Sequence, residues 1–514
     1  HFDRAYRRFT GEQRSFDEIA RMSRVLIMST TLAAELDLLA GRLARIADGN
    51  RHTQDYTRSG LRKALIEVAA RFPVYRTYVS PRGVSETDRR YIAWAVKAAR
   101  RASRIADPGV FDFVQGVLTL DAAPPAGERR GAMLDFAMRF QQFTAPVVAK
   151  GDEDTAFYRY SRLIALNEVG GNLGRFGLSL KAFHAASEDR ARRWSWTMLG
   201  TSTHDTKRSE DSRARLAVLS ELPGQWRLAL RRWSLLNRSV HGEVDGAPAP
   251  RRGDEYHFYQ ALVAIWPGAS PADLRERLKA YMLKAVREAK QHSSWINPDV
   301  EYEAALERFV GDALQNELFL KDLKEVMPRL AHLGMLVGLS QALLKVASPG
   351  VPDYYQGCEL WDFSLVDPDN RRPVDYDLRR KLLQKNGNPL KDLADGRAKL
   401  HIIRKGLELR RRLPQLFHGA RYTPLYADAG MDEKICAFSL SDQKDCMVAV
   451  APRLFASMLG NDLYPMGEKI WRESRLVLPE GEFTDALTGR RIAGGSQRVA
   501  DLLADFPVAL LSRA

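Results

Sequence analysis

Apolar residues recur with a helical period along the first hundred positions of the chain. One stripe at steps of three and four residues consists of Leu32, Leu36, Leu39, Leu43 and Ile46. Asp48-Gly49 follows the stripe and predicts the end of that helix. Upstream, Ser15 and Glu18 form a capping-box pattern, which predicts a helix start.

Two more helices are predicted before residue 110, over residues 61–70 and 88–106. Between them, Pro73 disfavours helix at its neighbour, so residues 72–79 are expected to be extended or looped. We therefore expect a helical domain over residues 1–110.

The pattern changes to short apolar runs ending in polar residues over 111–211, which is typical of barrel strands followed by catalytic loops. Long charged helices are predicted over 212–335, with a loop at Gly242–Gly253. Strand character returns at Leu343–Ala347, and Pro349-Gly350 ends it.

The last part of the chain is rich in predicted strands. Residues 435–440 and 446–451 flank the polar turn 441–445, which predicts a hairpin. We expect the last barrel strand and a helix over 336–420 and an antiparallel β domain over 421–514.

Composition bounds the class of protein. The 514 residues are 45% hydrophobic, enough for two to four folded domains,. No window approaches the roughly 18 uninterrupted apolar residues of a membrane span, and the first residues lack a signal peptide's apolar core. The three cysteines, Cys358, Cys436 and Cys446, lack metal-ligand spacing, which favours a reduced, cytoplasmic setting.

The net charge of +14 is compatible with a nucleic-acid or membrane partner or with an arginine-rich proteome,. Its distribution favours solvated helix faces, because basic runs such as Arg410-Arg411-Arg412 are brief and mixed with acids. No zinc spacing or aromatic-basic RNA signature is present. We expect neither a nucleic acid nor a membrane as partner.

The segment Thr201–Asp211 carries the strongest chemical signal. A short apolar run ends at His204-Asp205, and a charged helix start follows at Ser209,. This order places an imidazole and a carboxylate at the carboxyl end of a strand, where barrel enzymes keep their chemistry. For a lone His-Asp pair, a loop-capping interaction is the alternative.

Together with other segments, Thr201–Asp211 resembles the maltooligosyl trehalose synthases, a branch of the α-amylase superfamily of glycoside hydrolases. The matching segments are Gln141-Gln142, Ala149–Tyr160, Leu166–Gly171, Arg287–Lys290 with Ser294-Trp295, Pro349–Gly357 and Asp367–Tyr376. The resemblance implies an α/β fold consisting of the C-terminal part of a (β/α)8 barrel, with large helical insertions and a C-terminal antiparallel β domain.

The resemblance also implies an activity. Such an enzyme is an isomerase that moves the reducing-end α-1,4 linkage of a maltooligosaccharide to an α,α-1,1 linkage, an intramolecular transglucosylation of trehalose biosynthesis. The implied partner is a maltooligosaccharide substrate, and no cofactor or metal is implied. A trehalose-releasing hydrolase and a non-catalytic glucan-binding scaffold are the alternatives.

Roles follow from the resemblance for two neighbouring residues and for Lys150. Asp205 would stabilise the transition state through bonds to sugar hydroxyls that strengthen as positive charge develops. His204 would hold the same glucose. Lys150 would offer donors to the terminal sugar, and an ion pair with Asp152, Glu153 or Asp154 is an equally weighted interpretation.

Further sugar contacts are expected on a loop and on aromatic rings. Asp369 and Arg371 would hold the end glucose, with a salt bridge that closes the loop as the alternative and Arg372 as a substitute for Arg371. Tyr158 is a candidate for stacking on a sugar face, as are Phe157 and Phe176, although core packing is the commoner role.

Two carboxylates expected in this family, a nucleophilic Asp and an acid Glu, have no matching segment in this sequence. Three strands of an eight-stranded barrel are expected in it. We therefore expect the carboxyl-terminal portion of a longer enzyme, inactive without a missing N-terminal half and with an open sheet edge.

Overall fold

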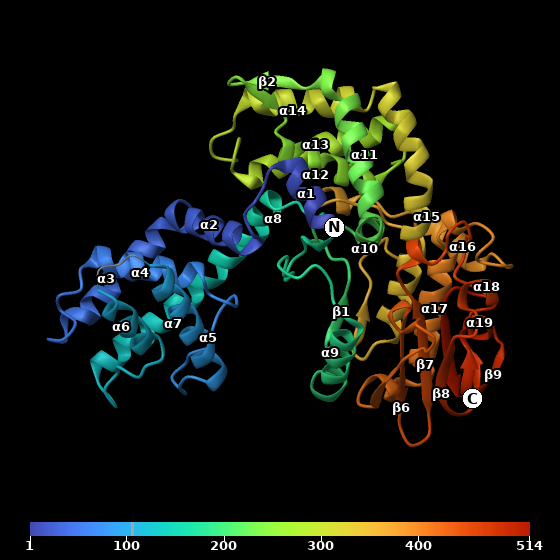
Figure 1. Cartoon of the computed structure of the whole chain (residues 1–514). Coiled ribbons are helices and arrows are strands. Elements are labelled where there is room, and N and C mark those ends of the chain that lie inside the picture. The colour runs from blue at the N-terminus through green and yellow to red at the C-terminus, as the bar shows by residue number, and fades with distance from the viewer. Residues whose placement is uncertain (104–106, 514) are drawn as a thin grey trace. The chain divides into compact units, whose positions relative to one another are not determined.

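The computed structural model describes residues 1–103 and 107–513, and the chain divides into two compact units. The helical unit comprises residues 13–161 and 285–299, and the mixed unit comprises residues 1–12, 162–284 and 300–514. Figure 1 shows the elements of each unit.

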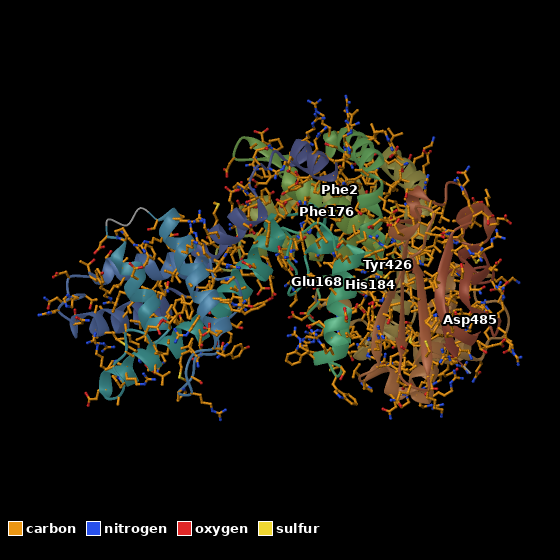
Figure 2. The ribbon with its side chains drawn as sticks, turned by 60° about the horizontal axis from the view of Figure 1, so that its bottom comes forward. Phe2, Glu168, Phe176, His184, Tyr426 and Asp485 are labelled. Carbon is orange, nitrogen blue, oxygen red and sulfur yellow. The ribbon has the colours of Figure 1, made fainter. Side chains whose placement is uncertain are left out.

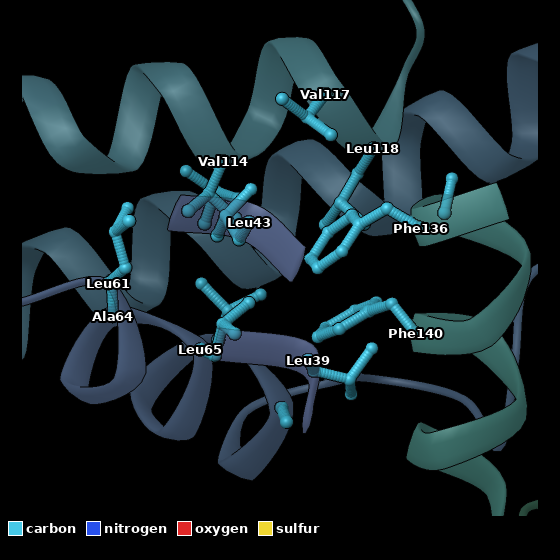
Figure 3. Close-up of a cluster of buried hydrophobic side chains, with 14 of the residues drawn as sticks. Leu39, Leu43, Leu61, Ala64, Leu65, Val114, Val117, Leu118, Phe136 and Phe140 are labelled. Carbon is cyan, nitrogen blue, oxygen red and sulfur yellow. The ribbon is translucent and has the colours of Figure 1, made fainter. Parts of the chain in front are cut away.

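The helical unit follows from the apolar stripes of its sequence. Its elements are α2 (Phe16–Ser29), α3 (Ala33–Asp48), α4 (Arg58–Ala70), α5 (Glu86–Ala102), α6 (Gly109–Leu118), α7 (Glu128–Val148), the π-helix η1 (Ala149–Ala156) and α8 (Phe157–Arg159). Leu36, Leu39, Leu43 and Ile46 of the predicted stripe lie on the buried face of α3, which meets α4, α6 and α7 in one apolar core (Figure 3), and Leu32 caps the helix. Each fully buried Leu or Phe there contributes about 1.5–3 kcal/mol.

Several helix predictions in this unit are confirmed. The Ser15 hydroxyl accepts from Glu18 N while the Glu18 carboxylate accepts from Ser15 N, so the capping box is present. Residues 72–79 carry no helix. The predicted helix over 88–106 is α5, which ends at Ala102, and residues 104–106 lie outside the described part.

The mixed unit contains most of the longer helices. They are α1 (Phe2–Thr10), α9 (Leu180–Arg193), α10 (Glu210–Val218), α11 (Pro223–Leu236), α12 (Arg252–Ile265), α13 (Pro271–Ala289), α14 (Val300–Ala313), α15 (Glu317–Ala347), α16 (Tyr376–Gln384), α17 (Arg397–Arg412), α18 (Glu468–Trp471) and α19 (Val499–Leu502). The last residues of α13 belong to the helical unit.

Short 3-10 helices connect the longer elements of the mixed unit. They are η2 (Ile164–Leu166), η3 (Leu219–Glu221), η4 (Arg238–Val240), η5 (Asp369–Arg371), η6 (Leu393–Asp395), η7 (Pro414–Phe417), η8 (Asp432–Lys434) and η9 (Phe455–Ser457).

The strands described in the mixed unit form three separate sheets. They are β1 (Met198–Gly200), β2 (Gly242–Val244), β3 (Ala247–Ala249), β4 (Val351–Asp353), β5 (Arg421–Leu425), β6 (Ile435–Ser441), β7 (Cys446–Pro452), β8 (Arg475–Asp485), β9 (Arg491–Arg498) and β10 (Ala509–Arg513). β1 pairs in parallel with β4, β2 pairs with β3, and the other six follow the order β5-β6-β7-β10-β8-β9.

The predicted antiparallel sheet near the C-terminus is confirmed, and it is part of the mixed unit. β6 and β7 form the predicted hairpin, with Ser441 opposite Cys446. Every residue of β7 is buried, because this central strand is covered on both faces,. Figure 1 shows the sheet in orange and red near the C-terminus.

The prediction of strands between residues 111 and 197 is wrong. Residues 111–118 and 128–148 lie in α6 and α7, where Phe111, Val114, Phe136 and Phe140 recur at helical steps. Lys150, within the range where strands were predicted, lies in the π-helix η1. Short apolar runs cannot by themselves distinguish a strand from a fully buried helix.

Other strand predictions also need correction. Leu343–Ala347 is the buried end of α15 rather than a strand, and the strand follows Gly350 as β4. Gly242–Gly253 contains the β2-β3 hairpin rather than only a loop. Instead of three barrel strands, the residues with described structure contain one parallel pair, β1 and β4.

α15 is long and apolar enough to cross a membrane by length and composition alone, and 67% of its apolar window is buried. α10 packs against this helix at Gly334, where an added Cβ would lie 2.7 Å from Arg215 Cα. Burial of this kind is expected of the core helix of a folded domain, and such a helix can have the same length and apolar composition.

The three cysteines are free and buried.

Candidate functional site

The parallel pair β1-β4 brings two loops to one sheet edge. Gly200, the last residue of β1, lies opposite Asp353, the last residue of β4. Gly350 makes this pairing possible, because its φ is +121° and an added Cβ would lie 2.7 Å from Thr197 O,. The loops that follow the two strands therefore start side by side, as loops do at the carboxyl edge of a parallel sheet.

His204 and Asp205 lie in a tight turn of the first loop. The Thr206 hydroxyl donates to Thr203 O at 2.9 Å, and the Asp205 N–H donates to the Thr203 hydroxyl at 3.1 Å. Both His204 and Asp205 are exposed. Within the described ranges, neither side chain makes a hydrogen bond, so the Asp205 carboxylate is available to a ligand.

Glu168 supports the turn from a neighbouring segment (labelled in Figure 2). Its carboxylate accepts from the backbone N–H of Lys207 at 2.8 and 3.0 Å and from that of Arg208 at 3.3 Å. The buried Arg208 guanidinium donates to Ile164 O at 3.1 Å and to Asn167 O at 3.3 Å. The Leu166–Gly171 segment, part of the family resemblance, therefore holds the residues that follow Asp205.

Asn370 supports the turn from the second loop. Its side-chain NH2 donates to His204 O at 2.9 Å and to Thr203 O at 3.4 Å. Two carbonyl acceptors identify the nitrogen side of this amide. The Asn370 Oδ1 atom is buried without a hydrogen-bond partner among the described residues.

A second link joins the loops at the start of α10. Ser209 N donates to Ser364 O at 3.0 Å, and Ser364 N donates to the Ser209 hydroxyl at 2.9 Å. The turn with Asp205 is therefore fixed at both ends, by Asn370 before it and by Ser209 after it.

A buried charge cluster lies at the N-terminus of α10. Lys399 Nζ is 2.7 Å from both Glu210 Oε1 and Asp211 Oδ2, and Lys345 Nζ is 3.4 Å from Glu210 Oε2. Carboxylates at a helix N-terminus are favoured by the helix dipole. The cluster anchors the helix that follows the turn.

The cluster shifts the pKa of each acid differently. Burial alone would raise the pKa of Glu210, but Lys399 and Lys345 outweigh it and lower that pKa to about 2. Burial raises the pKa of Asp211 to about 6, with Lys399 opposing and Glu210 reinforcing the shift. Burial opposes charge on Lys399, but the two carboxylates raise its pKa.

Comparisons with known proteins identify homologues of this chain. No family model matches the chain. A curated protein of Mycobacterium tuberculosis (strain CDC 1551 / Oshkosh) named maltooligosyl trehalose synthase is 39% identical over 382 residues, covering 73% of this chain and 45% of the relative. The maltooligosyltrehalose synthase of Arthrobacter ramosus superposes with a TM-score of 0.83 at 34% identity, covering 100% of this chain and 60% of that one.

This chain is a homologue of maltooligosyl trehalose synthases. A further crystal structure of a maltooligosyl trehalose synthase has a TM-score of 0.74 at 29% identity, covering 100% of this chain and 60% of the other. The chain thus spans less than half the length of its curated relatives and about three-fifths of the solved structures.

The family resemblance assigned sugar contacts to Asp369 and Arg371. Both Asp369 carboxylate oxygens accept from the Arg277 guanidinium, at 2.7 and 2.9 Å, and Leu365 N donates to one of them at 2.7 Å. Arg371 pairs with Asp367 at 2.5 Å. Arg372 Nε donates to Asp369 O at 3.0 Å. This arrangement is the loop-closing salt bridge given as the alternative, and the sugar contacts stay predictions.

Two predicted residues lie in the helical unit. Lys150 Nζ is 2.8 Å from Asp154 Oδ2, one of the ion pairs given as its alternative. Tyr158 is buried against Ala285 and Ala289 of α13. Packing therefore accounts for the position of Tyr158, and roles of both residues toward a sugar stay predictions.

Two other aromatic candidates differ in exposure. Phe157 is buried, with its ring centroid 6.1 Å from that of Phe16. Phe176 is 37% exposed and contacts Phe2 at 5.7 Å between ring centroids (Figure 2). Of the two rings, only that of Phe176 is open to a ligand.

The structure adds residues that sequence reasoning missed, namely Glu168, Asn370 and Arg277. Glu168 and Asn370 lie inside segments of the resemblance, so those segments could have pointed to both residues. The segments did not indicate which contacts the two side chains make. Arg277 lies on α13, where nothing in the sequence distinguishes it from other helix arginines. Across the described chain, no three His, Cys, Asp or Glu side chains are grouped to hold a metal ion.

Proposed function

We propose that this chain provides the sugar-positioning edge of a maltooligosyl trehalose synthase. The proposed reaction breaks the reducing-end α-1,4 linkage of a maltooligosaccharide. It then joins the freed glucose, through its anomeric oxygen, to the anomeric carbon of the shortened chain in an α,α-1,1 linkage. The observation that carries the proposal is the exposed Asp205 carboxylate at the carboxyl end of β1, on a turn fixed by Glu168 and Asn370. The names of the relatives supply the reaction class.

In this proposal Asp205 accepts hydrogen bonds from sugar hydroxyls next to the reacting carbon. These bonds strengthen as the carbon acquires oxocarbenium character, so they lower the barrier rather than only bind the substrate. His204 contacts the same glucose. Because the turn is already fixed, little reorganisation is needed as charge develops.

A retaining mechanism also needs a carboxylate nucleophile and a carboxylic acid that protonates the leaving oxygen. We propose that both come from family segments that this sequence does not contain. β1 and β4 would then be neighbouring strands of a barrel whose other strands lie in those segments. Excluding water from the closed site would favour transfer of the glycosyl group from the nucleophile to the freed glucose over its hydrolysis.

The test compares Asp205→Asn with wild type in the complete enzyme, prepared with the segment that carries the other two carboxylates. Conversion of maltopentaose is followed by the loss of reducing ends and by the anomeric NMR signals of the α,α-1,1 linkage. We expect kcat to fall at least about a hundredfold, because several kcal/mol of transition-state stabilisation are lost.

Asp432→Asn, an exposed aspartate in η8, is the matched control and should retain wild-type kcat. Retention of more than half the activity by Asp205→Asn would overturn the proposal. Release of free trehalose or glucose as the main product would favour the hydrolase alternative.

A further inference from the structure

A groove in the helical unit plays no part in the reaction proposed above. It lies between residues 74–85 and the start of α5, and its volume is about 700 Å³. Tyr75, Tyr78 and Tyr91 line it together with Arg82 and Thr87. Its size is in the range of small-molecule sites.

The wall of the groove is held by a buried amide of α7. Gln141 Oε1 accepts from Val79 N at 2.8 Å and from the Thr77 hydroxyl at 3.3 Å, and Gln141 Nε2 donates to Val79 O at 2.9 Å. Gln141 is 3% exposed. Gln141 belongs to one of the segments of the family resemblance, and its contacts fix the backbone of the loop at Val79.

The neighbouring backbone is fixed as well. Asp88 accepts from Tyr78 N at 3.1 Å and from the Ser85 hydroxyl at 2.7 Å, so its charge is bound within the wall. Ser80 and Gly83 exchange backbone hydrogen bonds at 3.2 and 2.9 Å. The loop is therefore preorganised, although it contains no regular strand.

This fixed loop presents aromatic rings to solvent. Tyr78 is 70% exposed and Tyr75 is 40% exposed. The Arg76 guanidinium lies over the Tyr78 ring, 4.7 Å from its centre. An exposed ring on a rigid loop binds at a low cost in conformational entropy.

We propose that this groove binds a stretch of the maltooligosaccharide chain outside the reacting glucose units. Apolar sugar faces would stack on Tyr78, and hydroxyls would bond to Arg82 and Thr87. The choice of a neutral glucan rests on the proposed function. The apolar faces of a neutral glucan stack on aromatic rings such as Tyr78, whereas an anion would be bound mainly by Arg76 and Arg82.

The test is titration of the whole chain with maltoheptaose by calorimetry. Tyr78→Ala should raise Kd about five- to tenfold through loss of stacking, and Tyr78→Phe should stay within about twofold of wild type. Because Tyr78 is exposed, both variants should fold, which circular dichroism checks. Tyr426→Ala, a 52% exposed tyrosine of the mixed unit (Figure 2), is the matched control and should bind as wild type.

The outcomes separate this site from the reaction. Absence of maltoheptaose binding, or equal affinity of Tyr78→Ala and wild type, would overturn the groove proposal. Displacement of maltoheptaose by tripolyphosphate would also overturn it, in favour of an anion site. Asp205→Asn should bind maltoheptaose at the groove as wild type does. A loss of catalysis in Asp205→Asn therefore tests the proposed function and not the groove.

Discussion

The Asn370 side-chain nitrogen lies 2.9 Å from the carbonyl oxygen of His204 and joins the loop after β4 to the turn that carries Asp205. Asp369, the preceding residue, is paired with Arg277 of α13. A line of direct contacts therefore runs from a helix through a salt bridge and an amide to the backbone beside the candidate catalytic carboxylate.

Asn370→Ala should loosen this turn without unfolding the chain. It removes the donor to His204 O, worth about 0.5–1.5 kcal/mol, and also removes the unpartnered Oδ1 atom,. Hydrogen-deuterium exchange of a peptide covering residues 201–209 should quicken about five- to tenfold. Asn388→Ala, which removes a loop contact to Leu390 N, is the control and should leave that peptide unchanged. Equal exchange in wild type and Asn370→Ala would show that the contact does not hold the turn.

His257 should make the fold sensitive to acid. Burial lowers the pKa of this imidazole to about 3, against an ordinary value of 6.5 in the unfolded chain. As pH falls below 6.5 the unfolded state takes up the proton first, so the contribution of His257 to stability is lost between pH 6.5 and 3. The difference in unfolding free energy between wild type and His257→Gln should therefore shrink by about 2 kcal/mol from pH 7 to pH 5. Calorimetric transitions at the two pH values measure it, and parallel pH profiles would contradict the shift.

Lys399→Met should be the most damaging change in the buried charge cluster. It leaves Glu210 and Asp211 without their common partner, which costs about 3–5 kcal/mol,. Without the cation the folded-state pKa values of both acids rise, so the acids are neutral at low pH and the penalty grows as pH rises. The melting temperature of the variant should recover toward wild type on going from pH 8 to pH 5.

Lys405→Met on the same helix α17 is the matched control. Lys405 pairs with Glu408 at 3.1 Å in a partly exposed position, so its loss should cost less than about 1 kcal/mol,. A pH-independent loss in Lys399→Met would refute the assignment of charge to the cluster.

Gly334→Ala should destabilise the contact between α15 and α10. The added Cβ would lie 2.7 Å from Arg215 Cα, and such overpacking costs about 1–3 kcal/mol,. Gly224→Ala in α11 is the control, since nothing lies within 4 Å of its added Cβ. Thermal melts should show a lower transition for the first variant and an equal or slightly higher one for the second.

Local signals in the sequence determined several elements correctly. The Ser15–Glu18 capping box, the stripe of α3 and the hairpin of β6 and β7 depend on neighbouring residues, so their patterns predict them. The order of the motifs along the chain also predicted the resemblance to maltooligosyl trehalose synthases. The same motifs placed Asp205 after a strand, because the spacing of residues within a motif can be read from the sequence without knowledge of the tertiary structure.

Tertiary structure alone decided the rest. α6, α7 and the end of α15 contain short apolar runs, which do not by themselves distinguish a strand from a helix segment packed in a core, and strands were predicted in their place,. The contacts of Asn370 with His204 and of Glu168 with Lys207 join positions 166 and 39 apart in the sequence. Such pairings depend on which loops the packed helices and strands bring together, and no local pattern contains that information.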